Sequence, residues 1–262
     1  TGSGTESNNQ VIKHALFKKF TENKPVHILY SSTEHSSVRV AADSLRLYGV
    51  DVDCIPVDSK GHISPELLRQ HIKPHTLLIS IMLANNETGT IQSLKPLIDV
   101  AHDHGALFHS DAVQALGKVP INVSDLAIDF MSFSGHKLYA PKGIGALYVK
   151  EDDHLSSFLH GGAHERHLRA STENITGIMA FDKALSLIDP DMFSAHTSPL
   201  IHQLSSQLTT HLSDTLINGD LHHGLTNTLN ISFKGVDGHA LAMCLDLEAS
   251  MSPQGQLAQW GL

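Results

Sequence analysis

Residues 106–149 read ALFHSDAVQALGKVPINVSDLAIDFMSFSGHKLYAPKGIGALYV, and this stretch decides the fold. Three short apolar runs within it, at 106–109, 128–133 and 144–149, each predict a strand. Polar clusters follow the first two runs at once, HSDA from residue 109 and SGHK from residue 134. In open sheets of parallel strands, ligands bind outside the carboxyl ends of the strands. The stretch therefore predicts a sheet that brings two polar clusters to one edge.

Upstream of this stretch, apolar runs alternate with segments of helical periodicity. Strands are predicted over residues 26–30, 50–57 and 76–83, and helices over 34–48, from Ser64 onward and over 94–104. Gly49 and Gly105 end the first and last of these helices, as glycine often does. Strands that alternate with helices form right-handed βαβ units. The predicted fold class is therefore α/β, with a doubly wound, mainly parallel sheet flanked by helices.

The pattern changes after Lys150. Residues 154–176 are polar and contain glycine, and the chain no longer alternates strictly between strand and helix. The periodicity predicts helices over 177–188 and 198–216, a strand over 227–233 and a further helix from Gly238.

Composition narrows the class of protein. The chain has 18 Lys and Arg against 27 Asp and Glu, a net charge of −9, with no basic cluster, which argues against nucleic-acid binding. A hydrophobic share of 41% excludes a disordered chain. No apolar run reaches the roughly 20 residues that span a membrane. Only two cysteines are present, so we expect a reducing, cytoplasmic compartment. The 20 histidines predict a net charge that responds to mild acid.

Two further polar segments accompany the clusters in the central stretch. TGSGTES, from residue 1, precedes a helix predicted over 9–20, and small residues at a helix start can bind an anion through backbone N–H groups. A flexible loop is the alternative for this segment. NNETG, from residue 85, follows the apolar run at 76–83. Three polar clusters after three successive strands predict a ligand site.

These motifs resemble the cysteine desulfurases, the sulfur-mobilising branch of the class V aminotransferases, which use pyridoxal phosphate (PLP). The similar segments also include PKGIGALYV from residue 141, EH at residue 34 and HGGAHER from residue 160. The resemblance extends from the first residue to about Glu248. It implies a PLP-binding large domain over residues 1–190 and an incomplete C-terminal small domain over residues 191–262.

The resemblance implies a role for each polar residue of the motifs. Lys137 would bind the cofactor covalently and act in catalysis, and His35 would stack on the cofactor ring and relay protons. Asp111 would face the pyridine nitrogen and keep it protonated. The other implied contacts are Gln114 and Asn86 at the ring hydroxyl oxygen, and Thr5, Ser134 and His136 at the phosphate.

The residues alone leave plainer alternatives open for four of these positions. Lys137 could be an ordinary surface lysine, and Asp111 could cap a helix that begins near residue 112. His35 could belong to a capping or surface pair, and Asn86 could be a turn residue.

Thr172 resembles a phosphate contact that the family takes from the neighbouring subunit, which implies a homodimer with shared sites. Ser171 stands where the family typically has glycine. If that position requires a positive φ, serine there costs energy.

The family takes L-cysteine as substrate, releases L-alanine and carries the sulfur as a persulfide on a mobile-loop cysteine, from which a sulfur-acceptor protein can receive it. The resemblance ends after Glu248, and residues 249–262 contain no cysteine. We expect Cys54, in a predicted strand, and Cys244, in a predicted helix, to be buried as small hydrophobic residues. The expectation is a desulfurase-like chain truncated at both ends, by fragmentation or a frameshift, with little or no turnover. A short protein that uses the cofactor domain otherwise is the alternative.

Other functions stay open at this point. Another class V enzyme, such as a selenocysteine lyase or an aminotransferase, would share the cofactor motifs, and a degenerate, non-enzymatic subunit would pair with a complete partner. Histidine abundance also suggests a metal site. The histidines and acid that fall close together are His102, His104, His109 and Asp111, with His164 and His167 further on. No HExxH motif is present, so we expect most of these to be surface or capping residues and predict no metal site.

Overall fold

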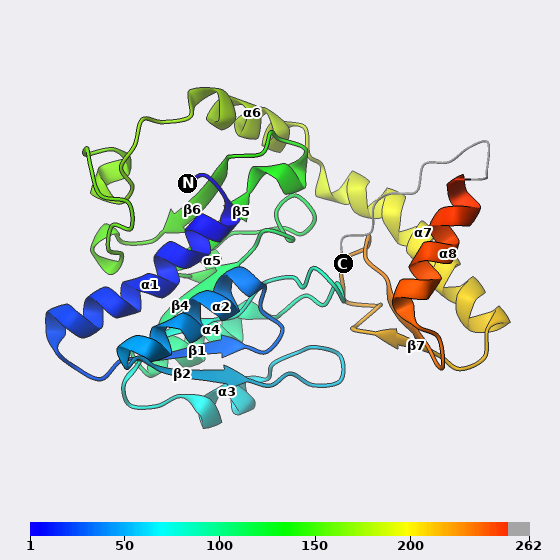
Figure 1. Cartoon of the computed structure of the whole chain (residues 1–262), viewed down its shortest axis with the longest axis horizontal. Coiled ribbons are helices and arrows are strands. Elements are labelled where there is room, and N and C mark those ends of the chain that lie inside the picture. Colours follow the sequence, from blue (N-terminus) through cyan, green and yellow to red (C-terminus); the bar gives the residue numbers. More distant parts are fainter. Residues whose placement is uncertain (251–262) are drawn as a thin grey trace.

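The computed structural model of the protein describes residues 1–250. Its centre is a six-stranded sheet in the order β2-β1-β3-β4-β5-β6 (Figure 1). The strands β1 to β5 are parallel, and β6 is antiparallel to β5. Their bounds are β1 His27–Ser31, β2 Asp51–Ile55, β3 Thr76–Ser80, β4 Leu107–Asp111, β5 Phe130–Ser134 and β6 Gly145–Val149. The predicted doubly wound, mainly parallel sheet is confirmed.

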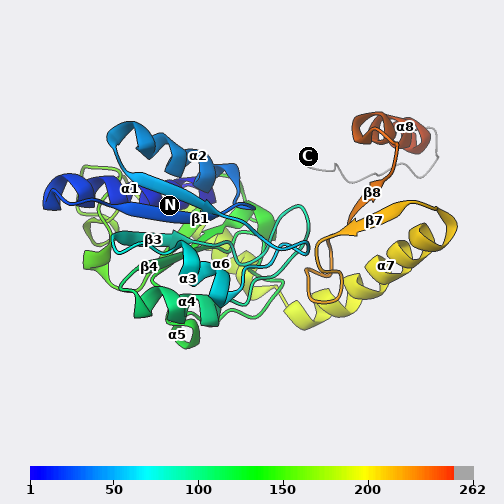
Figure 2. The same cartoon turned by 90° about the horizontal axis from the view of Figure 1, so that it is seen from below.

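Helices cover both faces of this sheet, because neighbouring residues of each strand point to opposite faces. Ile28 packs in the cluster beneath α1 and α2, whereas Leu29 belongs to the cluster beneath α3 and α4. Figure 2 shows α1 and α2 on one face and α3, α4 and α5 on the other. The helices of this part are α1 Gly4–Glu22, α2 Ser36–Ser44, α3 Pro65–His71, α4 Leu94–Asp103, α5 Val123–Leu126 and α6 Ile175–Ser186, with short 3-10 turns η1 Leu45–Tyr48, η2 Gly135–Leu138, η3 Asp152–His154 and η4 Glu165–His167. Among the residues described, no helix is long and apolar enough to cross a membrane.

A second, smaller unit follows α6 and lies beside the large sheet (Figures 1 and 2). It contains α7 Pro190–His211, β7 Thr215–Asn218, β8 Asn230–Phe233 and α8 Gly238–Ser250, and β7 pairs with β8 in an antiparallel ladder. Asp189 caps α7 by accepting hydrogen bonds from two backbone N–H groups, and Pro190 occupies its first turn. We propose that the boundary between the two units lies at this cap.

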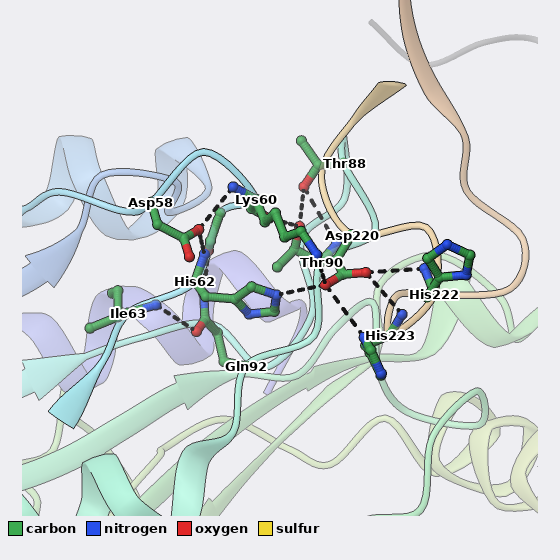
Figure 3. Close-up of polar contacts among 11 residues, drawn as sticks. Asp58, Lys60, His62, Ile63, Thr88, Thr90, Gln92, Asp220, His222 and His223 are labelled. Carbon is green, nitrogen blue, oxygen red and sulfur yellow. Dashed lines mark hydrogen bonds and ion pairs between the residues drawn. The ribbon is translucent and has the colours of Figure 1, made fainter. Parts of the chain in front are cut away.

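The smaller unit is attached to the large sheet around Asp220, which follows β7. Figure 3 shows its carboxylate among Lys60, His222 and His223. Lys60 Nζ donates to it at 3.1 Å, and the backbone N–H groups of His222 and His223 donate at 3.1 and 3.2 Å. Burial would raise the pKa of Asp220, but these hydrogen bonds outweigh burial and hold the pKa well below its usual value. Close by, Leu225 enters the core of the large unit, so the attachment is both polar and apolar.

Several predicted boundaries were wrong. α1 begins at Gly4 rather than at residue 9, because Ser3 caps it earlier. The helix predicted over 198–216 begins at Pro190 and ends at His211, and the strand β7 takes up residues beyond it. The helix expected after Asp111 is a series of turns over residues 113–118. In each case caps and tertiary pairing, rather than periodicity, set the ends.

The predicted burial of the two cysteines was also wrong. Cys54 is exposed on β2, which is the edge strand of the sheet and has a neighbour on one side only. Cys244 is exposed on α8, whose apolar residues Met243, Leu245 and Leu247 are exposed as well. Partial burial and the nearby carboxylates of Asp43 and Glu34 still raise the pKa of the Cys54 thiol.

Candidate active site at the carboxyl ends of the strands

The carboxyl ends of β4 and β5 meet the first turn of α1, and two glycines make this approach possible. A Cβ on Gly4 would lie 2.7 Å from Val113 Cγ2 and 3.4 Å from Ser134 Cβ. A Cβ on Gly145 would lie 2.7 Å from the carbonyl carbon of Ser3. Either side chain would push α1 away from the strands. The glycines therefore place the start of α1 directly against the ends of both strands.

The start of α1 has the features of an anion-binding helix terminus. The carboxylate of Glu6 accepts hydrogen bonds from the Gly2 N–H at 2.9 Å and from Arg169 Nε at 2.8 Å. Burial would raise the pKa of Glu6, but Arg169 and the Gly2 N–H outweigh burial and lower the pKa. The Glu6 charge is thereby paired, and Thr5 is exposed beside it. The positive end of the helix dipole is then available to an anion.

The end of β5 carries Ser134, His136 and Lys137. Ser134 Oγ and His136 Nδ1 lie 2.8 Å apart, and His136 and Lys137 are exposed on the η2 turn. Burial, followed by the charges of Lys137 and Lys142, lowers the pKa of His136. Lys137 is exposed, as the surface-lysine alternative expects, and its amine is accessible at the edge of the sheet.

Asp111, the last residue of β4, is 4% exposed and is held by two hydrogen bonds. Its Oδ1 accepts from the Val113 N–H at 2.9 Å, and its Oδ2 accepts from Asn8 Nδ2 at 2.7 Å. Burial raises the pKa of Asp111, and the two donors and His35 oppose that shift. The alternative that Asp111 caps a helix is correct only in part. Its Oδ1 accepts a hydrogen bond from the turn that follows, but no helix begins there. Oδ2 serves a different partner, so the two oxygens have separate functions.

The turns after Asp111 bring Gln114 together with a lysine that the motifs did not single out. Lys118 Nζ donates to Gln114 Oε1 at 2.9 Å. Burial first, and the charge of Lys137 second, lower the pKa of Lys118 to about 8. Since lysine can only donate, Gln114 turns its carbonyl oxygen toward Lys118 and keeps its NH2 group for other acceptors.

His35 is the N-cap of α2 and lies exposed above the end of β1. Its Nδ1 accepts from the Ser37 N–H at 3.1 Å and lies 2.7 Å from Ser37 Oγ. Ser37 Oγ in turn lies 2.8 Å from Asn8 Nδ2, which also bonds Asp111. The capping alternative for His35 is therefore correct, and the cap connects His35 to Asp111 through two side chains.

Glu34, next to His35, is a buried acid to which the sequence motifs assigned no role of its own, and its burial contradicts the surface-pair alternative. Its Oε1 accepts from the Met82 N–H at 2.6 Å, and Oε2 has no hydrogen-bond partner within residues 1–250. Burial, and then the charge of Asp111, raise its pKa well above the ordinary value. Acidic residues with strongly shifted pKa values are frequent at functional sites.

In the NNETG cluster, the turn is built by Asn85 rather than by Asn86. Asn85 Oδ1 accepts from the backbone N–H groups of Glu87 and Thr88, at 2.9 and 2.8 Å. Asn86 is exposed. Asn86 itself lies in this turn, over residues 86–88, so the turn-residue alternative holds for it, and its side chain is exposed to a ligand.

Thr172 lies on an exposed segment before α6. Ser171 has a φ of 98°, so the condition for strain at that position is met. Among the described residues, no hydrogen bond connects Thr172 or Asn86 to the other predicted site residues. Hydrogen bonds join His35 to Asp111 through Ser37 and Asn8, and Ser134 to His136. Thr5, Gln114 and Lys137 lie on the neighbouring segments, at the start of α1, in the turns after β4 and on η2, without a direct hydrogen bond to these residues in the described part of the chain.

The histidines suggested for a metal site do not converge. His102 Nε2 lies 2.8 Å from Asp129 Oδ2, and His104 Nδ1 lies 2.7 Å from a backbone carbonyl in α4. His109 is fully buried, with Ser80 and Ser132 hydroxyls at its two ring nitrogens, and burial lowers its pKa to about 3. It is therefore neither a surface nor a capping residue.

A different set of potential ligands lies at the amino ends of β1 and β2. His27, Asp51 and Asp53 bring one ligand atom each within 4.8 Å of one another. However, Lys73 Nζ lies 2.7 Å from both carboxylates, so an ammonium group already pairs with them and offsets one of their two negative charges.

Comparison with known proteins agrees with this geometry. The sequence profile of the family described as "Aminotransferase class-V" matches residues 1–256. The cysteine desulfurase IscS of Dictyoglomus turgidum is 38% identical over 250 residues, which are 95% of this chain and 63% of that protein. The cysteine desulfurase IscS of Methanosarcina thermophila is 40% identical over 258 residues, which are 97% of this chain and 63% of that protein. The chain thus spans less than two thirds of the length of these relatives.

Solved structures show the same fold. A NifS-like protein superimposes with a TM-score of 0.88 at 33% identity, over 95% of this chain and 68% of that one. A structure of SspA in complex with cysteine gives a TM-score of 0.80 at 33% identity, over 94% of this chain and 68% of that one. The sheet, the polar cluster at its edge and these similarities lead to one conclusion: the chain belongs to the class V aminotransferase family.

Proposed function

We propose that this chain binds PLP at the edge formed by β4, β5 and α1, as the cofactor-binding part of a cysteine desulfurase. The observation that carries the proposal is the placement of Asp111 and Lys137 at the ends of adjacent parallel strands, beside the start of α1. A carboxylate, an amine and an anion-binding helix terminus are the three groups that PLP requires. The cysteine desulfurases among the relatives support the choice of L-cysteine as substrate.

The residues present fit the cofactor in charge and in hydrogen-bond type. The start of α1, with Thr5, Ser134 and His136, would hold the phosphate, and Asp111 would hold the ring nitrogen. Gln114 and Asn86 would bind the ring oxygen, His35 would lie on the ring and Lys137 would supply the amine. A buried carbonyl oxygen, Asn8 Oδ1, also has no partner among the described residues, which suits a site that is completed by a polar ligand. When bound, PLP withdraws electrons from the substrate carbon.

The chain's own residues prepare this site electrostatically. Burial raises the pKa of Asp111, and the Val113 N–H and Asn8 oppose this shift by stabilising the ionised form, the form that would keep a ring nitrogen protonated. Lys118 fixes the carbonyl oxygen of Gln114, and the NH2 group of Gln114 is then the donor for an acceptor oxygen. Arg169 neutralises Glu6, which would otherwise repel a phosphate from α1.

We infer further that this chain by itself does not transfer sulfur from L-cysteine. Its two cysteines are Cys54 and Cys244. The Cys54 pKa is raised, which favours the thiol over the nucleophilic thiolate, and Cys244 lies on α8 in the smaller unit. Cys54 is therefore not an activated thiol.

We also propose a homodimer in which Thr172 completes the phosphate site of a second copy. Thr172 is exposed, and among the described residues it has no hydrogen bond within its own chain, so it is accessible to another copy. Light scattering of the purified chain tests this point, and a strictly monomeric mass with and without PLP would contradict it.

The cofactor proposal is tested by adding PLP and recording the visible absorption band of the lysine-bound cofactor. We expect the band in the parent chain and in Lys142→Ala, an exposed neighbouring lysine, and its loss in Lys137→Ala. The absence of a band in the parent would refute cofactor binding. The inference that the chain does not transfer sulfur is tested by adding L-cysteine and measuring the formation of L-alanine and of a protein persulfide. Rapid turnover would contradict that inference.

A further inference from the structure

A continuous chain of hydrogen bonds runs from the buried acid of the site to the exposed histidine. Asn8 Nδ2 is 2.7 Å from Asp111 Oδ2 and 2.8 Å from Ser37 Oγ. Ser37 Oγ is 2.7 Å from His35 Nδ1, and the Ser37 N–H donates to the same nitrogen at 3.1 Å. Asn8 and Ser37 are 1% and 8% exposed, and the two hydrogen bonds of Asn8 Nδ2 are buried, so water does not compete at these two contacts.

The chemistry of each group fixes the direction of every hydrogen bond in this chain. The Asp111 carboxylate can only accept, so the Asn8 group that faces it is NH2. The second hydrogen of this NH2 points to Ser37 Oγ, which therefore accepts. A backbone N–H can only donate, so His35 Nδ1 is the acceptor and carries no hydrogen. The remaining hydrogen, that of the Ser37 hydroxyl, must then also point to Nδ1.

We infer that Asn8 and Ser37 are positioning residues that hold neutral His35 in the form with its proton on Nε2. The exposed edge of the ring then presents a hydrogen-bond donor, not a base, to a ligand above Asp111. For Nε2 to act as a base, the proton would have to move to Nδ1, which would break the bond from the Ser37 N–H and would force the Ser37 hydroxyl to turn from donor to acceptor. This inference rests on the proposed function for its role in the site, but the proton position itself belongs to the protein.

The proton position can be read directly from histidine labelled with ¹⁵N, since long-range ¹H–¹⁵N spectra distinguish the two neutral forms. The spectra are recorded without cofactor at about pH 8, where an ordinary histidine is neutral. The His35 signals are identified by their loss in His35→Gln. We expect the pattern of the Nε2–H form in the parent chain. The Nδ1–H pattern in the parent would overturn the inference, whether or not any variant folds.

Substitutions then test whether Ser37 is responsible. Ser37→Ala removes the hydroxyl and keeps the backbone N–H, and one hydrogen bond of about 1 kcal/mol corresponds to about a fivefold change in the ratio of the two forms. We expect that change in favour of Nδ1–H in Ser37→Ala. The matched control Ser36→Ala, at an exposed serine of the same turn, should leave the ratio unchanged, and Ser37→Thr should restore the parental ratio.

The outcomes separate this inference from the proposed function. An unchanged ratio in Ser37→Ala would remove Ser37 from the positioning role. If PLP gives no absorption band while His35 shows the Nε2–H pattern, the proposed function fails and the inference about the proton holds. If the band forms and His35 shows the Nδ1–H pattern, the inference fails and the proposed function holds.

Discussion

Replacement of the buried Glu34 by glutamine is expected to change how the stability of the chain depends on pH. Glu34 is 6% exposed, and burial, with the charge of Asp111 next, raises its pKa well above the ordinary value. In Glu34→Gln, the amide oxygen can still accept the hydrogen bond from the Met82 N–H. The substitution therefore removes one titration and keeps the size and the main contact of the side chain.

The sign and size follow from proton linkage. In the unfolded chain Glu34 titrates near its reference pKa of about 4.3, whereas the folded chain keeps the proton to higher pH. The contribution of Glu34 to the free energy of unfolding is fully present below its pKa in the unfolded chain. This contribution is lost as the pH rises toward its pKa in the folded chain, by at most about 1.4 kcal/mol per pH unit. Glutamine has no such dependence. From pH 5 to pH 7, the stability of Glu34→Gln relative to the parent should rise by up to about 3 kcal/mol.

The assay is urea unfolding of the parent and the variant at several values from about pH 5 to pH 7. Only the difference between the two free energies of unfolding is used, because the other titrating groups contribute equally to both. Glu6→Gln is the control. Arg169 and the Gly2 N–H hold the pKa of Glu6 below its ordinary value against burial, so Glu6 is ionised in both states over this range. Its difference should be constant with pH.

A constant difference for Glu34→Gln would refute the reasoning. Parallel stability curves would mean that Glu34 binds protons equally in the folded and unfolded chains, and hence that its buried carboxyl is not neutral. A difference that falls as the pH rises would mean that a cation stabilises the carboxylate.

Substitutions at four other positions test the fold. Burial lowers the pKa of His109 to about 3, so the folded chain loses stability as the pH falls below about 6.5, the pKa of histidine in the unfolded chain. In His109→Gln, the free energy of unfolding measured in urea should depend less steeply on pH than in the parent, by up to about 1.4 kcal/mol per pH unit. Equal slopes of the free energy against pH would contradict this. Asp220→Ala deprives two backbone N–H groups and the exposed Lys60 of their acceptor. We expect it to lower the free energy of unfolding in urea by about 2–3 kcal/mol, and Asp220→Asn to lower it by about 1 kcal/mol. Equal losses would show that the charge alone matters. Phe108→Ala, at a fully buried core position, should cost about 3–5 kcal/mol by the same measurement, and a cost below about 1 would contradict the packing. Ser171→Gly should stabilise the chain by about 1 kcal/mol through relief of the positive φ, seen as a higher melting temperature, and a lower one would contradict the strain.

The sequence alone determined the sheet and two of the site's principal residues. Short apolar runs separated by helical segments specify a parallel sheet, because burial on both faces selects such runs. Asp111 and Lys137 could then be placed at one edge, since parallel strands bring their carboxyl ends together. Helix ends were predicted well at Gly49, which has a φ of 73°, because glycine acts locally. Periodicity did not predict the boundary between α7 and β7, because strand pairing with a distant segment sets it.

Only the tertiary structure decided how the site is prepared. Asn8 and Asp111 are 103 residues apart in sequence, and Asn8 and Ser37 are 29 apart, so no local pattern indicates that they are hydrogen-bonded. The raised pKa of Glu34 depends on burial, and burial is a property of the packed chain. The same holds for Cys54, whose exposure follows from the position of β2 at the sheet edge. Residue types and spacing specify which groups are present, whereas packing decides their protonation and hydrogen-bond partners, because both depend on the solvent and neighbours that folding removes or supplies.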